Sequence, residues 1–83
     1  MSCDKVKQAK KTIIGIKQTV KAIRAGKAME IIVASDADKK LILPVLREAE
    51  LQAVPVSYIE SRKALGESCG VEVGTAVVAI TRY

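Results

Sequence analysis

The sequence predicts an α/β fold in which helices cover both faces of a central sheet. Short apolar runs of strand length alternate along the 83-residue chain with stretches whose apolar residues recur at helical spacing. Hydrophobic residues make up 49% of the chain, which is enough for a core, and an aromatic share of 2% requires that core to be aliphatic. Because a chain of this length has room for one core, we expect a single domain over residues 1–83.

The N-terminal segment predicts a short helix followed by an apolar break. Residues 4–11 are polar and rich in lysine, and their apolar residues are spaced as in a short helix. Residues 12–15 form a brief apolar run that a glycine ends. This run is either a short strand or a turn that leads into the next element.

Residues 16–25 give the clearest helix in the sequence. Apolar residues recur there at intervals of four and three and form one stripe: Ile16, Val20 and Ile23. Basic residues follow the same spacing about 100° further round the helix: Lys17, Lys21 and Arg24. Gly26 stands where a glycine typically ends a helix. The core-facing stripe and the basic stripe are therefore neighbours on one element.

The middle of the chain predicts a buried strand, a polar break and another helix. Residues 29–34 are apolar and rich in β-branched side chains, as a buried strand is. Residues 35–38 are polar and include residue types that cap helices. Residues 39–52 have helical spacing, but Pro44 removes one backbone donor, so this helix is either kinked there or starts late.

The last part of the chain predicts a strand, a short helix and a final strand. Residues 54–59 alternate in polarity, which is typical of a strand. Ser61 is suited to cap a helix that runs to about Ser68 and ends at Cys69 and Gly70. Residues 76–81 form an apolar strand.

Positive charge is concentrated in the first third of the chain. The formal net charge is +5 and the isoelectric point is about 9.4. Residues 1–27 carry eight basic residues against one acid, whereas residues 28–83 carry six basic residues against eight acids. Such a basic surface is typical of nucleic-acid binders, although a solvated basic face that keeps a small protein in solution has the same composition.

The residue types needed for catalysis or for a metal site are scarce. Histidine is absent, which removes the commonest proton carrier at neutral pH and the commonest metal ligand. Cys3 and Cys69 are too few for a disulfide framework or a zinc site, and Cys69 fits a small core-facing thiol. Asp36 and Asp38 suit a hard cation, but helix capping is the commoner role of such a pair. We therefore expect no enzyme activity, no catalytic residue, no metal and no cofactor.

The sequence gives no sign of membrane association. No apolar run approaches the roughly 20 residues that cross a bilayer, and the charged N-terminus lacks the apolar stretch of a secretory signal. We expect a cytoplasmic monomer with reduced thiols.

The start of the helix over residues 16–25 is the strongest candidate for a binding site. Free N–H groups and the helix dipole favour an anion such as phosphate near Gly15, and Lys17 adds positive charge there. Gln18 carries both a donor and an acceptor and can read a base edge. Lys21 lies one turn further along the same side. Because aromatic residues for stacking on single strands are scarce, we expect a structured RNA or a duplex groove as the target.

Three sequence blocks occur in a recognisable order. The first, GIKQTVK at residues 15–21 with a later glycine, is similar to G-x-N-E-x-x-K followed by glycine. The second, VASDAD at residues 33–38, is similar to a strand followed by A-x-D-x-D/E-P. The third, YIESRKALG at residues 58–66 with CGV at residues 69–71, is similar to a hydrophobic loop followed by S-K-x-x-L-G-x-x-x-G. In this order and spacing the chain resembles the small bacterial members of the kink-turn RNA-binding family, which includes ribosomal proteins L7Ae and L30e.

This resemblance implies an α-β-α sandwich with a mixed four-stranded sheet, and a role in binding kink-turns. In a kink-turn, a bulge beside tandem sheared G·A pairs bends the duplex sharply and crowds its phosphates. The family's helix start enters the groove at these pairs, its hydrophobic loop covers the splayed nucleotides, and a third set of positions lines a pocket for a flipped-out base. The corresponding residues are Gly15, Lys17, Gln18 and Lys21 at the groove, Ile59, Glu60 and Ser61 in the loop, and Asp38 and Ile42 at the pocket.

Several positions depart from the family pattern. Lys17 stands where Asn is usual, and Gln18 stands where Glu is usual. Lysine cannot accept a hydrogen bond, while glutamine keeps one acceptor and gains donors, so the base contacts differ in detail and binding depends more on salt. Lys39 replaces a proline, and Glu60 occupies a loop position that is basic in some relatives.

Two functions are compatible with these observations. The first is an RNA-binding protein that recognises and stabilises kink-turns. The second is a ribosome-associated structural protein that docks on ribosomal RNA, or on a protein partner, without kink-turn specificity. Candidate RNA partners are ribosomal RNA, a riboswitch and ribonuclease P RNA. Stable association with the ribosome is also left open.

Overall fold

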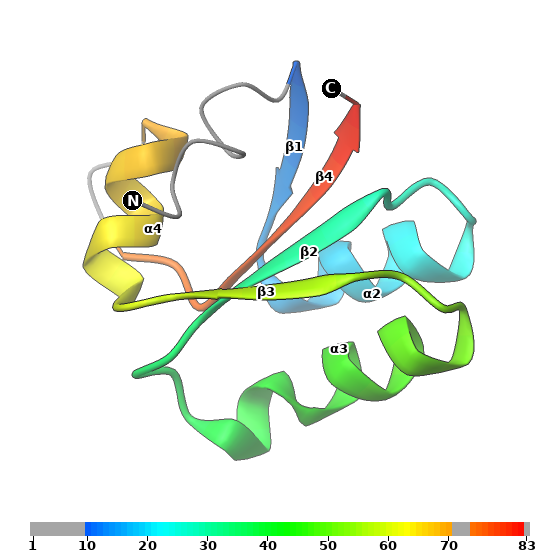
Figure 1. The fold of residues 1–83 in the computed structure, drawn as a ribbon, viewed down its shortest axis with the longest axis horizontal. Helices are drawn as coiled ribbons and strands as arrows, with labels where there is room; N and C mark the ends of the chain where they lie inside the picture. Colours follow the sequence, from blue (N-terminus) through cyan, green and yellow to red (C-terminus); the bar gives the residue numbers. More distant parts are fainter. Residues whose placement is uncertain (1–9, 71–73, 83) are drawn as a thin grey trace.

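Four strands form one mixed sheet in the order β1-β4-β2-β3 (Figure 1). The computed structural model describes residues 10–70 and 74–82. The strands are β1 (Lys11–Ile14), β2 (Glu30–Ala34), β3 (Val56–Ile59) and β4 (Val77–Arg82). β2 and β3 pair in parallel, whereas β4 is antiparallel to both β1 and β2. The mixed four-stranded sheet that the family resemblance implies is confirmed.

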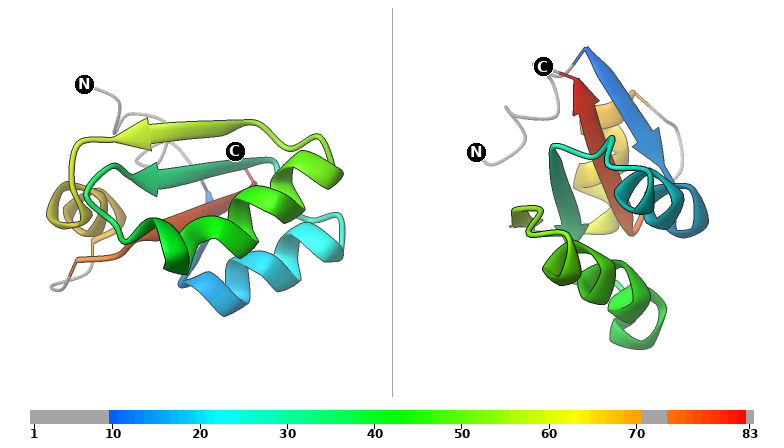
Figure 2. Two further views of the ribbon diagram at one scale, coloured as in Figure 1. Left: turned by 90° about the horizontal axis from the view of Figure 1, so that it is seen from below. Right: turned by 90° about the vertical axis from the view of Figure 1, so that its right-hand side faces the viewer.

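Three helices cover the two faces of this sheet: α2 (Ile16–Arg24), α3 (Lys39–Leu51) and α4 (Arg62–Cys69). α2 and α3 pack against each other on one side, and α4 packs against β2, β3 and β4 from the other (Figures 1 and 2). All five residues of β2 are buried, although successive side chains point to opposite faces. Both faces of the sheet are therefore covered, and the α-β-α arrangement is confirmed.

The core is aliphatic, as the composition requires. Each helix contributes a residue with no exposed surface, namely Ile23 from α2, Val45 from α3 and Leu65 from α4. These side chains pack on the buried isoleucines, valines and alanines of β2 and β4. Cys69 is half-buried and packs against the edge of this cluster, in agreement with its predicted role as a core-facing thiol.

Glycines end α2 and α4 where the sequence predicts. Gly26 has a φ of 72°, and its N–H donates to Ile23 O at 3.0 Å. Gly70 adopts the left-handed conformation with a φ of 78° and follows the last residue of α4. A side chain at either position would strain the backbone, because L residues rarely adopt this conformation.

The helix predicted over residues 4–11 is wrong at its C-terminal end, and residues 4–9 lie outside the described part of the chain. Lys10 N–H donates to Arg82 O at 2.8 Å, and Lys11 begins β1. Residues 12–14 belong to this strand, so the apolar run there is a short strand and not a turn. Pairing with β4 therefore overrides the lysine-rich helical pattern at residues 10 and 11.

Pro44 lies inside α3 and does not delay its start. The helix begins at Lys39 and continues through the proline to Leu51. Of the two alternatives that the sequence leaves open, a kink at Pro44 or a late start, the structure excludes the late start. The helix tolerates Pro44 because one flank of α3 packs on α2 and the core, and this burial compensates for the missing hydrogen bond.

Candidate nucleic-acid interface

The starts of all three described helices lie at one end of the sheet. β1, β2 and β3 run in the same direction, because β2 and β3 are parallel and β4 is antiparallel to both β1 and β2. Each of these three strands is followed after a short connection by a helix, so α2, α3 and α4 begin at the same end (Figure 2, left). The positive ends of three helix dipoles therefore converge there.

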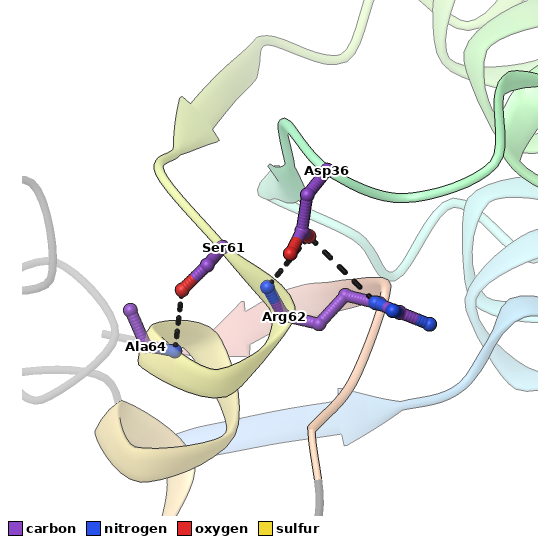
Figure 3. Close-up of polar contacts among 4 residues, drawn as sticks. All are labelled: Asp36, Ser61, Arg62 and Ala64. Carbon is purple, nitrogen blue, oxygen red and sulfur yellow. Dashed lines mark hydrogen bonds and ion pairs between the residues drawn. The ribbon is translucent and has the colours of Figure 1, made fainter.

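Side chains cap α3 and α4 but not α2. Asp38 Oδ1 accepts a hydrogen bond from Lys40 N–H at 2.9 Å at the start of α3. Ser61 Oγ accepts from Ala64 N–H at 3.0 Å at the start of α4 (Figure 3). Gly15 is the N-cap of α2, and no side chain of the described residues accepts from the first N–H groups of this helix. The start of α2 is thus the helix end with donors available for an external anion.

The backbone of Gly15 fixes the direction in which α2 leaves the sheet. Its N–H donates to Val77 O at 3.3 Å, and its carbonyl accepts from Thr19 N–H at 3.0 Å. Its φ of 108° and ψ of 156° lie in a region that is open almost only to glycine. A Cβ placed on Gly15 would lie 3.4 Å from Gln18 Oε1, so the Gln18 carboxamide folds back over the start of the helix.

The predicted polar residues of α2 are exposed and lie on adjoining sides of the helix. Lys17, Gln18 and Lys21 are all exposed. Lys21 lines one shallow hollow with Gln18 and a second one with Lys17, so it lies between them. The arrangement joins two ammonium groups and one amide around a helix end with available N–H donors. Their contacts with RNA stay a prediction.

Asp36 joins three segments at this end of the sheet. Its Oδ1 accepts from Arg62 N–H at 2.8 Å and lies 3.7 Å from Arg62 Nε (Figure 3). Arg62 O in turn accepts from Thr75 N–H at 3.1 Å. A Cβ on Gly74 would lie only 3.1 Å from the Arg62 backbone, which shows how closely the segment before β4 approaches α4. These contacts hold the end of β2, the start of α4 and the segment before β4 together.

Both aspartates after β2 cap helices, as the sequence favours. Asp38 caps its own helix, and Asp36 caps α4 from a distant part of the chain. In residues 10–70 and 74–82, no three His, Cys, Asp or Glu side chains gather as metal ligands would. No helix in this same part of the chain is long and apolar enough to cross a membrane.

Two site residues that the family resemblance implies are buried. Ile59 ends β3 with a side chain only 2% exposed, and Ile42 on α3 is 4% exposed. Both belong to the aliphatic core, so neither side chain offers the apolar surface expected for nucleotides. Both positions fall on the inward side of their elements, so this structure does not support the contacts that the resemblance implies for them. These contacts stay a prediction.

The remaining predicted residues lie at the helix-start end of the sheet. Glu60 and Asp38 are exposed, whereas Ser61 is half-buried. Asp38 and Ser61 each use a side-chain oxygen to cap a helix. The sequence did not predict the Asp36–Arg62 contact, because a cap that reaches across 26 positions leaves no local pattern.

Comparison with known proteins identifies the family. The model of the Ribosomal protein L7Ae/L30e/S12e/Gadd45 family matches residues 2–83. The chain belongs to this family. The resemblance deduced from three sequence blocks is thereby confirmed over nearly the whole length.

Relatives in the family support the same placement. The chain is 51% identical to an "RNA-binding protein" of Geobacillus sp. (strain WCH70) over 82 residues, which are 99% of this chain and 100% of that protein. It is 49% identical to "RNA-binding protein YbxF" of Geobacillus stearothermophilus, with the same coverage. Among solved structures, the "Giardia lamblia 15.5kD RNA binding protein" is 33% identical with a TM-score of 0.87, and the match covers 99% of this chain and 72% of that one.

Proposed function

We propose that this member of the L7Ae/L30e family binds structured RNA and recognises kink-turn motifs through the start of α2. The observation that carries the proposal is the uncapped helix start surrounded by exposed Lys17, Gln18 and Lys21. Relatives that match the whole chain are named as RNA-binding proteins, which supports the class of ligand. The family resemblance implies that Gly15, Lys17, Gln18 and Lys21 contact the RNA groove, and these are the residues at this helix start.

The chemistry of the helix start suits a bent RNA. Free N–H groups and two ammonium groups lower the repulsion between phosphates that a sharp bend brings together. The Gln18 carboxamide offers one acceptor and two donors to the edges of the guanines in sheared G·A pairs. Because these contacts are available only when the groove is open and the phosphates are close, the protein binds the bent form more tightly than the straight form.

A gel-shift comparison tests the recognition of kink-turns. A kink-turn duplex and a duplex whose G·A pairs are replaced by Watson–Crick pairs are titrated at one fixed salt concentration. We expect clearly tighter binding of the kink-turn duplex. Equal binding of both duplexes would contradict the proposal and favour docking on ribosomal RNA without kink-turn specificity.

Variants of α2 test the position of the site. Gln18→Ala and Lys21→Ala are each expected to cost about 1–3 kcal/mol of binding free energy on the kink-turn duplex, because each removes a base or phosphate contact at the groove. Arg82→Ala is the matched control, because Arg82 is exposed and pairs with Lys11 at the opposite end of the sheet. If Arg82→Ala proves as costly as Lys21→Ala, the site is misplaced.

A further inference from the structure

A cationic groove runs between α2 and α3 and continues from the proposed site at the start of α2. Two adjoining hollows share Arg24 and Pro44 in their walls. The hollow nearer the helix start contains Lys17 and Lys21, and the other contains Lys40 and Arg47. α2 and α3 lie side by side (Figure 2). The two hollows therefore extend the proposed site along this packed pair of helices.

The five cations stand in two rows, one on each side of the groove. Lys17, Lys21 and Arg24 recur at intervals of four and three along α2, and Lys40 and Arg47 lie seven apart on α3. Seven residues of helix rise roughly 10 Å, so both rows have the same length. The hollows are also lined by Ile16 and Val20 of α2 and by the exposed Leu43 and Pro44 of α3.

Glu48 is the only acid that lines either hollow in the described residues. It lies 3.1 Å from Arg24 Nε, and its side chain is 17% exposed against 68% for Arg24. This contact positions Arg24, and most of the Arg24 side chain still faces solvent. Five positive charges against one negative charge leave the groove strongly basic.

We infer that this groove binds the phosphodiester backbone of the stem that flanks the bend in the bound RNA. The inference rests on the proposed function, because the flanking stem enters the groove only from an RNA held at the start of α2. Two rows of cations match the charge of a polyanionic strand, and the apolar strip between them is a surface for ribose carbons. RNA is favoured over an acidic protein because the groove is continuous with the proposed RNA site through Lys17 and Lys21.

The salt dependence of binding measures the contribution of the groove. The double variant Lys40→Ala/Arg47→Ala removes two exposed cations of α3 that lie outside the proposed contact at the start of α2. The slope of log affinity against log salt on the kink-turn duplex is expected to fall by about two, since each phosphate contact contributes about one. At 0.1 M salt the affinity is expected to fall about tenfold for each lost contact.

A matched pair of charges provides the control. Lys11→Ala/Arg82→Ala also removes two exposed cations, but these face each other across β1 and β4 at the opposite end of the sheet. This control is expected to change the slope by much less than one. Equal changes in the two double variants would overturn the inference, because they would reflect net charge alone. An unchanged slope in the groove variant would also overturn it and assign the groove to another partner, such as an acidic protein.

A gain of binding and a shortened RNA sharpen the test. Glu48→Gln removes the acid of the groove and is expected to tighten binding about two- to fivefold at low salt.

Shortening one of the two flanking stems is expected to abolish the difference in affinity between the groove variant and the unmodified protein, while the effect of Gln18→Ala persists. If neither shortened stem does so, the inference is wrong even though the kink-turn is recognised. If the unmodified protein binds both duplexes equally, the proposed function fails, and the slope of the groove variant still decides whether the groove binds RNA.

Discussion

At the residue scale, Gly15 fixes the conformation at the start of α2, where we propose that RNA binds. Its φ of 108° and ψ of 156° are strained for any residue with a Cβ, at a cost of about 1–3 kcal/mol. A Cβ at this position would also lie 3.4 Å from Gln18 Oε1 and restrict the carboxamide that we expect to read the bases.

Gly15→Ala is therefore expected to lower both stability and RNA affinity. The free energy of unfolding should fall by about 1–3 kcal/mol in urea titrations, because the backbone conformation becomes strained. Binding of the kink-turn duplex should weaken even under conditions where the variant is fully folded, as judged by circular dichroism. Gly26→Ala is the control, because Gly26 also has a positive φ but lies at the far end of α2. Equal losses of affinity in both variants would assign the effect of Gly15→Ala to stability alone.

The sequence predicts the exposure of some candidate residues but not the burial of others. Lys17, Gln18 and Lys21 are charged or polar residues outside the apolar stripe of their helix, so periodicity alone places them in solvent. Ile59 and Ile42 are apolar residues that either a core or a ligand could contact. Composition cannot distinguish these environments, and the structure shows that the core covers both side chains.

Pro44 shows at the element scale how tertiary packing overrides a local rule. A proline in the interior of a helix costs about 3 kcal/mol relative to alanine, because it removes a hydrogen bond and crowds the preceding turn. α3 nevertheless continues from Lys39 to Leu51, with Ile42, Val45 and Ala49 buried on its inner side. The burial of this apolar side stabilises the helix despite the proline.

Pro44→Ala is expected to stabilise the protein. The helix regains one hydrogen bond, while the unfolded chain gains some conformational freedom, so we expect a net increase of about 1–2 kcal/mol in the free energy of unfolding. Because Pro44 is exposed, the substitution opens no cavity in the core. Urea titration measures the change, and Leu43→Ala in the neighbouring exposed position serves as control. A loss of stability in Pro44→Ala would show that the ring itself packs favourably between α2 and α3.

The bounds of the elements were predictable wherever a cap or a glycine marks them. Ser61 and Gly70 bound α4, and Asp38 precedes α3 as its cap. The start of β1 was not predictable, because the partner that pairs residues 10 and 11 is Arg82 near the other end of the sequence. The same holds for Asp36, whose capping role concerns a helix that begins 26 positions later.

At the scale of the whole molecule, strand order decides where function is located. The alternation of helices and strands predicts a layered α/β fold, but it does not give the order β1-β4-β2-β3. With β4 between β1 and β2, the helix that follows β1 still packs beside the helix that follows β2 on one face of the sheet, while α4 lies on the other face. Three cations of α2 are therefore placed along one flank, where they lie near Lys40 and Arg47 of α3 at the groove.

This distribution of charge predicts that the protein bends its RNA as well as binding it. In the proposed complex, the cations of α2 and α3 would relieve the phosphate repulsion that opposes the bend, so we expect the bent form to be bound more tightly than the open form. A ligand shifts an equilibrium only by its differential affinity. A tenfold preference would raise a bent population of about 10% to about one half, and a larger preference would raise it further.

Fluorescence energy transfer between dyes on the two stem ends measures this shift. With a kink-turn duplex in low salt without Mg²⁺, we expect transfer to rise as protein is added and to saturate at the efficiency of the bent form. The duplex with Watson–Crick pairs in place of G·A pairs should show no rise. Adding Mg²⁺, which favours the bend before the protein arrives, should tighten the apparent affinity by the factor by which it enlarges the bent population, because only that population binds well. Tight binding without any change in transfer would show that the helix start accepts straight RNA, and the mechanism of population shift would then be wrong.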